Sequence, residues 1–382
     1  MTGDYPTGVE GEDADGTRQE FMFEGYERPG GSVGVRDRVL VLPSVICSHV
    51  VADRIADCIE DAVSAPHDHG CAQIGSDHEQ TKRTLLNVAR NPNIAGTLVI
   101  GLGCEHVQSN DVATRLDELG QTARELSIQD VGGTDSAIDQ GLSSVRNLRQ
   151  ETGSGSRLAG PDELTLGITC TDLTDETVER AAPLVGKLAD KVAAAEGRVV
   201  AAGIEPLITH PEAAYDAVTA EATETLDVLL ARHEGMPAKA RTVERAARDR
   251  SFAAATRAWG EGPIQEILDY GEVARHDEGL AVIDSPSQFV EAATALVAAG
   301  AQAIIHLTDE GIPTGHPVTP VVKISGNAAT CEALSDDIDV DATAVSAAEF
   351  EAQIAEILAG EQSRAEKHGV TDFGITRIGP SM

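Results

Sequence analysis

Short apolar runs alternate with longer amphipathic segments along most of the chain. The runs are too short for buried helices, whereas the segments between them repeat apolar residues at helical spacing. The clearest strands are expected at residues 39–42, 97–100, 126–129, 164–169, 198–203, 280–283, 301–307 and 321–324. Because strands alternate with helices in this way in α/β proteins, the pattern predicts an α/β fold with mainly parallel sheets.

The same pattern divides the chain into two parts. Helices of the first part are expected at 49–63, 81–89, 110–119 and 134–150. The longest helical stretch of the second part is expected between 211 and 259. Residues 151–163, ETGSGSRLAGPDE, are small, polar and glycine-rich, which is typical of a linker. We therefore predict two Rossmann-like α/β domains, at 21–150 and 164–382, after a disordered acidic tail at 1–20.

The charge balance narrows the classes of function. Acidic side chains number 63 and basic ones 29, which gives a formal net charge of -34. Such a surface repels phosphate backbones and anionic lipids, so binding to nucleic acid or membranes is not expected. The acidic residues are spread through every predicted helix, and aromatic residues make up only 3% of the chain. This composition is typical of a halophilic protein, in which concentrated salt screens the self-repulsion; an ordinary acidic enzyme is the alternative.

The location of the protein is expected to be cytoplasmic. No apolar run approaches the ~20 residues that span a bilayer. The polar N-terminus is unlike a signal peptide or a transit peptide. The six cysteines lie far apart, which predicts reduced thiols and no disulfide framework.

Thiols follow several of the predicted strands. Cys47 and Cys104 come after strands of the first domain, Cys71 lies in a loop between them, and Cys170 follows the first strand of the second domain. Ligands of parallel α/β sheets bind where strands end and the chain turns into a helix. These thiols are therefore candidates for a functional site. Small buried apolar side chains are the alternative for each one alone.

Histidines and a carboxylate accompany these thiols. The sequence HDHGC places His67 and His69 beside Cys71, and Glu105 and His106 follow Cys104 directly. Thiolate, imidazole and carboxylate groups on neighbouring loops suit a transition metal such as iron. No fixed CxxC or HxxxH spacing identifies the site, so structural packing remains the alternative.

Two glycine-rich stretches are candidates for phosphate or anion sites. The stretch 28–37, RPGGSVGVRD, precedes a strand, so it predicts a turn or hairpin and not a dinucleotide loop. Gly132, Gly133 and Thr134 follow a strand and open a helix, where free backbone N–H groups can hold a carboxylate. A tight turn capped by Thr134 or Asp135 is the alternative.

A proline-rich stretch of the second domain, DEGIPTGHPVTPVVKISGN, carries three further candidates. His316 and Asn327 are candidates for substrate binding. Lys323 lies within an apolar run, and a buried lysine requires a partner or a task. The alternative is a lysine at the strand margin whose ammonium reaches solvent.

Four separated motifs together resemble the altronate and galactarate dehydratase family, in its large catalytic portion. They are GYERPGGSVGVRDRVLVLPSVICS, HDHGCAQ, NPNIAGTLVIGLGCE and IQDVGGT, in family order. The similarity resumes in GLAVIDSP, in the proline-rich stretch and in DDIDVDA, with a weak middle from about 170 to 275. The resemblance implies an iron- or manganese-dependent hydro-lyase that converts a polyhydroxy sugar acid to a 2-keto-3-deoxy acid.

The resemblance also suggests roles and partners. Dehydration requires a base for the proton beside the carboxylate and a Lewis acid for the departing hydroxyl. His69 or Lys323 is the expected base, and Glu105 is expected to face the ligand beside Cys104. The metal is expected on the thiols, as a single ion or in an iron–sulfur cluster: Cys47, Cys71, Cys104 and Cys170. A small SAF-type subunit encoded separately is implied, and a homo-oligomer is compatible with the sequence.

The chain departs from the family pattern in its second half. CTDLTD, residues 170–175, stands where the family typically has Cys-Gly-Gly-Ser-Asp, and Glu310 stands where an arginine is usual. A carboxylate at that position repels an acidic substrate. A divergent, non-dehydrating binding or regulatory subunit is therefore one alternative. A lyase that removes sulfite from sulfolactate is the other.

Overall fold

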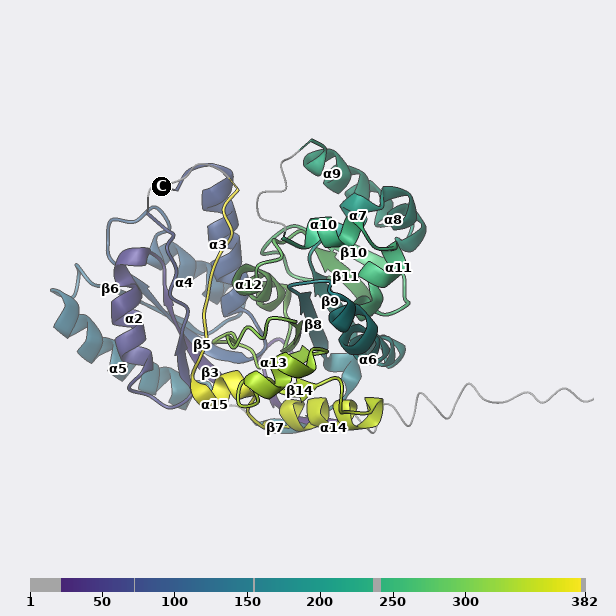
Figure 1. The fold of residues 1–382 in the computed structure, drawn as a ribbon. Coiled ribbons are helices and arrows are strands. Elements are labelled where there is room, and N and C mark those ends of the chain that lie inside the picture. The colour runs from purple at the N-terminus through teal and green to yellow at the C-terminus, as the bar shows by residue number, and fades with distance from the viewer. Residues whose placement is uncertain (1–21, 72, 154, 236–241, 379–382) are drawn as a thin grey trace, which may run out of the picture.

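The computed structural model describes residues 22–378 apart from 72, 154 and 236–241. It contains helices packed on two parallel sheets and one small antiparallel sheet (Figure 1). The predicted α/β class with mainly parallel sheets is confirmed. The predicted tail at 1–20 lies outside the described residues.

The first parallel sheet has four strands in the order β4-β3-β5-β6. Their bounds are β3 Arg38–Pro43, β4 Ala62–Ser64, β5 Ile94–Gly101 and β6 Ala123–Ser127. Helices on one face are α2 His49–Ala56 and α5 Thr134–Glu151, and on the other α3 Ser76–Ala89 and α4 Ser109–Glu118. Alternate residues of β3 serve the two faces: Val39 and Val41 pack with α2 and α5, whereas Leu40 and Leu42 pack with α3 and α4.

The structure corrects two bounds of this half. The predicted helix 49–63 ends at Ala56, and β4 follows after a turn in which Asp61 has φ 60°. The polar sequence between them ends the helix, and Ala62–Ser64 joins the edge of the sheet beside β3. The strand predicted at 126–129 begins earlier, at Ala123, because its first residues pair with β5.

The second parallel sheet has seven strands in the order β10-β11-β9-β8-β12-β13-β14. Their bounds are β8 Thr165–Cys170, β9 Arg198–Ala202, β10 Ile264–Leu268, β11 Gly279–Ile283, β12 Ala303–Leu307, β13 Val321–Ser325 and β14 Val340–Asp341. The sequence did not predict β10 or β14. The order reverses between β8 and β12, so the carboxyl ends of these two strands form the usual crevice of an open α/β sheet.

The helices of the second half differ from the prediction in one region. The long stretch 211–259 is divided into short helices: α8 Pro211–Ala217, α9 Thr223–His233, α10 Thr242–Arg248 and α11 Phe252–Ala255. The other α-helices are α6 Ala182–Ala194, α7 Glu205–Thr209, α12 Phe289–Ala299, α13 Ala328–Ala333, α14 Ala347–Leu358 and α15 Arg364–His368.

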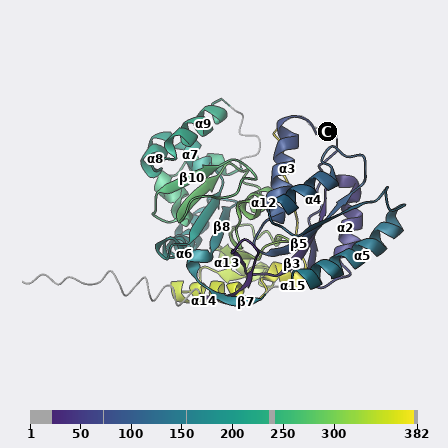
Figure 2. The same ribbon diagram turned by 180° about the vertical axis from the view of Figure 1, so that it is seen from behind.

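A small antiparallel sheet lies below the two parallel sheets, in the order β2-β1-β7 (Figure 2). Its strands are β1 Phe23–Glu27, β2 Val33–Gly34 and β7 Ser156–Ala159. The hairpin of β1 and β2 confirms the turn predicted at 28–37. The predicted linker, 151–163, contains β7, which pairs with β1 along its length. This stretch is therefore partly ordered by pairing and is not an open linker.

The two halves share one apolar core. Helix α12 is buried along almost its whole length, between the second sheet and α3 of the first half. Polar contacts reinforce this packing: the Arg36 guanidinium donates to Glu366, with Nε–Oε1 2.9 Å, and Arg38 pairs with the same carboxylate. The loops of the two halves are therefore held in a fixed relation.

The C-terminal segment, residues 371–378, returns from α15 to the first half and runs beside α3 (Figure 1). The Gln80 side chain donates to the Thr376 carbonyl at 2.7 Å, and the Ile378 N–H donates to Asp77 Oδ1 at 2.6 Å.

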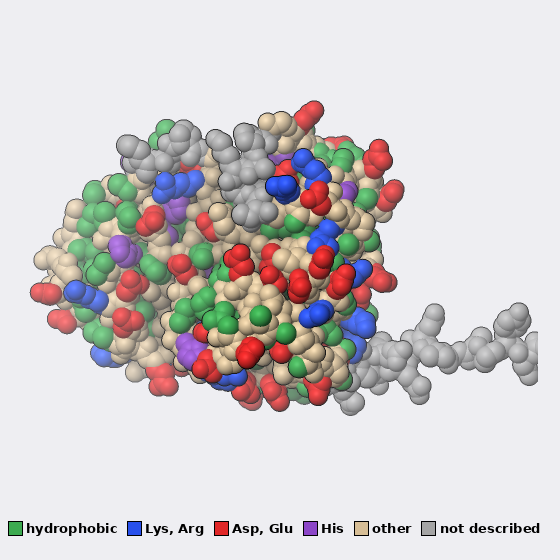
Figure 3. Space-filling model, in the orientation of Figure 1, with side chains coloured by type: hydrophobic (Ala, Val, Ile, Leu, Met, Phe, Trp, Pro, Cys, Tyr) green, Lys and Arg blue, Asp and Glu red, His purple; other side chains and the backbone are tan. Residues whose placement is uncertain are grey.

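Acidic side chains are scattered over the face seen in Figure 3, with fewer basic ones among them. In the described part of the chain, no helix is long and apolar enough to cross a membrane.

Candidate functional site

Three loops meet at the carboxyl edge of the first parallel sheet, after β3, β4 and β5. The Ile46 N–H donates to the His69 carbonyl at 2.9 Å, which ties the first loop to the second. The His106 N–H donates to the Gly70 carbonyl at 3.1 Å, which ties the third loop to the second. The loop that carries HDHGC is therefore held between its two neighbours.

Gly70 permits this close approach. Its φ is 89°, and a Cβ at this position would lie 2.1 Å from the Ser44 carbonyl oxygen. An L side chain is disfavoured by both features. The glycine of HDHGC therefore fixes the path of the loop and, with it, the positions of His67 and His69.

Both histidines of this loop are buried and their ring nitrogens are engaged. His67 Nε2 lies 2.7 Å from the Pro43 carbonyl, and its Nδ1 accepts the His69 N–H. His69 Nε2 lies 2.8 Å from the Ile375 carbonyl, and its Nδ1 lies 3.1 Å from Gln73 Nε2. Because each Nε2 faces a carbonyl, each ring is the Nε2–H tautomer with a lone pair on Nδ1.

Burial keeps both imidazoles neutral. Loss of solvent lowers the pKa of His67 to about 4. The pKa of His69 is also lowered, chiefly by burial and further by the nearby charge of Arg377. A neutral imidazole is the form that can accept a proton, so His69 has the protonation state that a general base requires.

A cavity of about 440 Å³ opens beside these histidines. Its walls come from the histidine loop, from Glu291 of α12 and from the C-terminal segment between Asp372 and Arg377. His67, Asp68 and His69 line it from the first half. Residues separated by about 300 positions in sequence therefore form one concave surface.

The ring of Phe373 connects the histidine loop with the proline-rich loop. Its centroid lies 6.2 Å from that of His67 and 5.6 Å from that of His316. His316 is 1% exposed, its Nδ1 accepts the Val318 N–H, and its Nε2 lies 3.4 Å from Thr294 Oγ1. His316, which was predicted to bind substrate, is therefore a buried ring whose two nitrogens already have partners within the protein.

Glu105 is turned into its own loop. Its Oε2 accepts the Gly103 N–H at 2.7 Å, and its Oε1 accepts from Ser44 Oγ at 3.1 Å. The side chain is 3% exposed and fills the space beside Gly101, where a Cβ would lie 2.3 Å from Oε1. The catalytic role predicted for Glu105 remains a prediction. In this arrangement the carboxylate fixes the loop instead of facing a ligand.

The thiols divide into two groups. Cys47, Cys71 and Cys104 are exposed on the three joined loops, and their predicted role as metal ligands remains a prediction. Cys170 ends β8 of the other sheet, where its thiol donates to the Asp172 carbonyl at 2.6 Å and burial raises its pKa. A protonated, hydrogen-bonded thiol is a poor metal ligand, so Cys170 does not fit the predicted set.

The described residues do not form a ready metal site. Among them, no group of three or more His, Cys, Asp or Glu side chains lies close enough to hold a metal ion. Both histidines of HDHGC use their nitrogens in hydrogen bonds. The donor set predicted for iron or manganese is thus not assembled among the described residues.

The second sheet also gathers ionisable groups at its carboxyl edge, but in a packed arrangement. Lys323 is 0% exposed, and its Nζ donates to the Pro313 carbonyl at 3.0 Å and lies 3.8 Å from Asp339 Oδ2. Burial lowers the pKa of Lys323 and raises that of Asp339. Of the two alternatives for Lys323, the structure shows the buried lysine with a partner, and its ammonium does not reach solvent.

His306 lies beside Lys323 on the neighbouring strand β12. Its ring stacks on Phe289 with centroids 4.4 Å apart, its Nε2 lies 3.1 Å from Thr171 Oγ1, and burial lowers its pKa to about 3. No sequence motif marks this histidine, which lies within an apolar run.

The remaining candidates mark helix starts. Gly133 is the residue before α5 and has φ 117°; neither Thr134 nor Asp135 caps the helix. A Cβ at Gly132 or Gly133 would meet no atom within 4 Å, so this turn is open to solvent. Asn327 caps α13, since its Oδ1 accepts from the Ala329 and Thr330 N–H groups. The structure brings neither the glycine turn nor Asn327 into the cavity beside His69.

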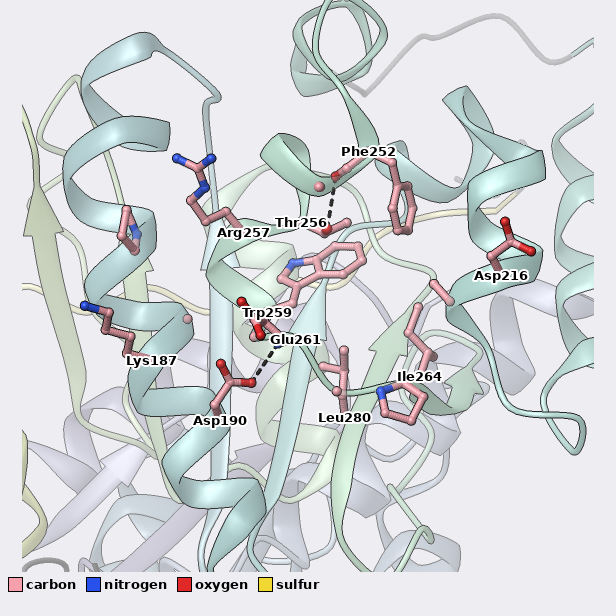
Figure 4. A pocket seen from close by; sticks show the side chains of 17 residues that line it. Lys187, Asp190, Asp216, Phe252, Thr256, Arg257, Trp259, Glu261, Ile264 and Leu280 are labelled. Atoms are coloured by element: carbon pink, nitrogen blue, oxygen red, sulfur yellow. Dashed lines mark hydrogen bonds between the residues drawn. The ribbon is translucent and has the colours of Figure 1, made fainter. Parts of the chain in front are cut away.

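Another cavity, of about 640 Å³, lies around Trp259 and faces α6 (Figure 4). It adjoins Ile264 and Leu280, which stand at the amino ends of β10 and β11. Its polar groups serve local structure: Asp190 Oδ1 accepts the Glu261 N–H at 2.7 Å, and Thr256 donates to the Phe252 carbonyl. Because parallel sheets bind ligands at the opposite edge, we favour the cavity beside His69.

Sequence reasoning missed Arg377, which lines the favoured cavity. No motif surrounds it, and only the return of the C-terminal segment brings it to the histidine loop. The sequence carries no signal for it, because arginine supplies most of the basic residues of the chain and occurs throughout it.

Comparison with known proteins agrees with this arrangement. Residues 25–153 match the model of the D-galactarate dehydratase/altronate hydrolase second domain, and residues 241–381 match that of the D-galactarate/altronate dehydratase C-terminal domain. These spans include the histidine loop, the three exposed thiols of the joined loops and the C-terminal segment.

Curated relatives match along most of the chain. An altronate dehydratase of Bacillus subtilis is 26% identical over 96% of this chain and 80% of its own length. An altronate dehydratase of Escherichia coli is 27% identical, covering 94% and 78%. The (2R)-sulfolactate sulfo-lyase subunit beta of Chromohalobacter salexigens is 27% identical, covering 93% and 97%. The chain belongs to the D-galactarate/altronate dehydratase family.

Proposed function

We propose that the protein is a hydro-lyase that removes water from a polyhydroxy sugar acid to give a 2-keto-3-deoxy acid. The observation that carries the proposal is the neutral His69 in the cavity at the carboxyl edge of the first sheet, opposite the C-terminal segment. The altronate dehydratases among its relatives catalyse the reaction that their name describes, and both share the chain over most of its length.

The reaction requires a base at the carbon beside the carboxylate. His69 takes the C2 proton on Nδ1, and the C2–H electron pair forms the C2=C3 double bond as the C3–O bond breaks. The hydroxyl leaves as water with the proton that His69 returns. The enol becomes the 2-keto acid when the proton of its C2 hydroxyl passes through solvent to C3. In the structure the Gln73 side-chain amide donates to His69 Nδ1, and the His69 Nε2–H group donates to the Ile375 carbonyl. Substrate must therefore displace the Gln73 amide before the Nδ1 lone pair can act as the base.

Iron or manganese dependence remains part of the proposal as a prediction. The exposed Cys47, Cys71 and Cys104 lie on joined loops, so a rearrangement or an added subunit would be needed to complete a donor set. Metal analysis of protein purified without oxygen checks the prediction. Loss of bound metal in Cys104→Ser, but not in Cys58→Ser, is the expected result.

The activity is tested by a keto-acid colour assay on aldonates and aldarates in concentrated salt. We expect formation of a 2-keto-3-deoxy acid by the parent protein and none by His69→Asn. A folded, His69-intact protein that turns over no sugar acid, with or without a small partner subunit, would contradict the proposal. It would favour a non-dehydrating binding or regulatory subunit, to which the carboxylate of Glu310 in place of the family's arginine also points.

Sulfolactate is the second candidate substrate. The sulfo-lyase relative is a subunit by name, and this chain covers 97% of its length. That coverage also supports the expectation of a separate small subunit for this protein. Release of sulfite from sulfolactate, measured with a thiol-reactive dye in the same assay, distinguishes this activity from dehydration.

A further inference from the structure

The charges around the cavity beside His69 are unevenly distributed. Among the described residues that line it, Arg377 is the one arginine or lysine, whereas Asp68, Glu291 and Asp372 are acidic. Three histidines also line it, His49, His67 and His69, and burial lowers the pKa of the last two, which are therefore neutral. The cavity therefore offers one positive group among several hydrogen-bond acceptors.

The Arg377 side chain is available for a ligand. It is exposed, and no carboxylate or carbonyl within the described part of the chain pairs with its guanidinium. Other arginines of the described part, such as Arg36, Arg232 and Arg250, pair with a carboxylate. A free guanidinium at a cavity wall is a suitable partner for a carboxylate, which it binds through two parallel hydrogen bonds.

The backbone on both sides of Arg377 is fixed. His69 Nε2 lies 2.8 Å from the Ile375 carbonyl, and the Ile378 N–H donates to Asp77 at 2.6 Å. Gln80 holds the Thr376 carbonyl between them. Consequently the Arg377 side chain projects from a pinned segment next to the proposed base, and not from a free end.

From this arrangement we infer that the cavity binds a polyhydroxy monocarboxylate, whose one carboxylate pairs with Arg377 and whose hydroxyls donate to Asp68 and Asp372. The inference rests on the proposed function and names its substrate class. A diacid would place its second carboxylate against the acidic wall, where like charges repel. Aldonates are therefore preferred to aldarates, and Arg377 is a substrate-binding residue.

The test measures binding by calorimetry at one fixed ionic strength, with gluconate as the monoacid and galactarate as the diacid. The parent protein is expected to bind gluconate at least about tenfold more tightly than galactarate, a difference of about 1.4 kcal/mol. Arg377→Gln is expected to weaken gluconate binding by a factor of about ten or more. Arg377→Lys is expected to lie between, because lysine keeps the charge and loses the paired hydrogen bonds.

Matched variants separate this site from the general charge of the protein. Arg146→Gln removes the same charge from an exposed position on α5 that does not line the cavity, and it should change the affinity less than about twofold. Asp68→Asn neutralises one of the carboxylates that line the cavity, so it should raise the affinity for galactarate relative to that for gluconate. Unchanged melting temperatures show that the variants are folded.

Three outcomes would overturn the inference: binding of neither acid by the parent, equal or tighter binding of galactarate, or equal losses in Arg377→Gln and Arg146→Gln. Binding is measured without turnover, so the two proposals fail separately. Gluconate binding that depends on Arg377 without any dehydration contradicts only the proposed function. Dehydration with an unchanged KM in Arg377→Gln contradicts only this inference.

Discussion

The carboxyl edges of the two parallel sheets carry similar residue types in different states. At the first sheet, exposed thiols and two neutral histidines lie on loops around an open cavity. At the second, Cys170, His306 and Lys323 are enclosed by packed neighbours and have protein partners. The same position at a parallel sheet therefore leaves a cavity in one half and is filled by packed side chains in the other.

The difference arises from what covers each edge. The first edge is closed by the C-terminal segment, which contributes the Ile375 carbonyl and leaves about 440 Å³ beside it. The second edge is covered by the proline-rich loop, whose Pro313 carbonyl accepts directly from Lys323. Residue type and strand end locate a candidate site, whereas the covering segment decides whether a ligand can reach it.

The largest expected effect is on catalysis at the first edge. His69→Asn removes the proposed base, and general base catalysis typically contributes a factor of 10² to 10⁴ in rate. We expect kcat to fall by about that factor, and the melting temperature to fall as well, because the buried Ile375 carbonyl loses its donor. Steady-state kinetics on the best sugar acid, together with a thermal melt, provides the measurement.

His106→Asn serves as the control for this comparison. His106 is exposed on the neighbouring loop and does not line the cavity. We expect its substitution to leave kcat within about twofold. An equal decrease of kcat in His106→Asn and His69→Asn would place the reaction at the loop of Cys104 and His106 instead of the cavity.

The next effect concerns stability at the second edge. Lys323→Met leaves Asp339 buried without its cation, and breaking a buried ion pair in this way costs about 3–5 kcal/mol of folding free energy. Lys367→Met is the matched control, since Lys367 forms an exposed pair with Glu361 and such pairs contribute about 0–1 kcal/mol. Urea unfolding in concentrated salt measures both.

The double variant Lys323→Met/Asp339→Asn should recover part of the loss, because it removes the uncompensated charge. A Lys323→Met protein that keeps full stability but loses kcat by a factor of 10² or more would reverse the comparison. Lys323 would then be the catalytic base expected as the alternative to His69.

The free energy of unfolding is expected to decrease at acid pH, because histidines are buried in both regions. The pKa values of His67, His306 and His316 are lowered from 6.5 to about 4, 3 and 3 by burial. The unfolded chain therefore binds more protons than the native protein between pH 6.5 and pH 3–4. Stability from these groups is fully present above pH 6.5 and is lost as the pH falls through that window.

Chemical unfolding at pH 7.5, 6, 5 and 4 tests this slope at constant salt. His316→Asn keeps an acceptor for the Val318 N–H and removes one titrating group, so its stability should fall less steeply with decreasing pH. A parent protein with equal stability at pH 7.5 and pH 4.5 would contradict the burial of these rings.

Local patterns in the sequence predicted the parts of the fold that depend on local chemistry. The apolar run at Val39–Leu42 identifies β3, because both faces of this strand are buried. The predicted helix beyond Ala56 was wrong because a short edge strand carries too few residues to show a period. Strands β10 and β14 were missed for a similar reason, as pairing with neighbours defines them.

The candidate site was predictable only in its first half. HDHGC points to His69 as a candidate, because the motif groups two histidines with a thiol in one loop. Its partner Ile375 and the cavity residue Arg377 lie about 300 residues away in a segment without a motif. The position of such a distant segment depends on tertiary contacts, so no local sequence pattern predicts it.

Labelling of thiols in the native protein is the smallest perturbation. It tests directly whether the carboxyl edges of the two parallel sheets differ in access to solvent. Cys47, Cys58, Cys71 and Cys104 are exposed, whereas Cys170 is half-buried with a raised pKa and Cys331 is buried with a pKa raised by burial to about 11. Because the thiolate is the reactive form, we expect four fast thiols and two that react only after unfolding. Mass spectrometry after a brief maleimide pulse assigns them. Fast labelling of Cys170 would show that the second edge opens to solvent, and slow labelling of Cys47, Cys71 and Cys104 together would show that a bound ion or subunit covers the first.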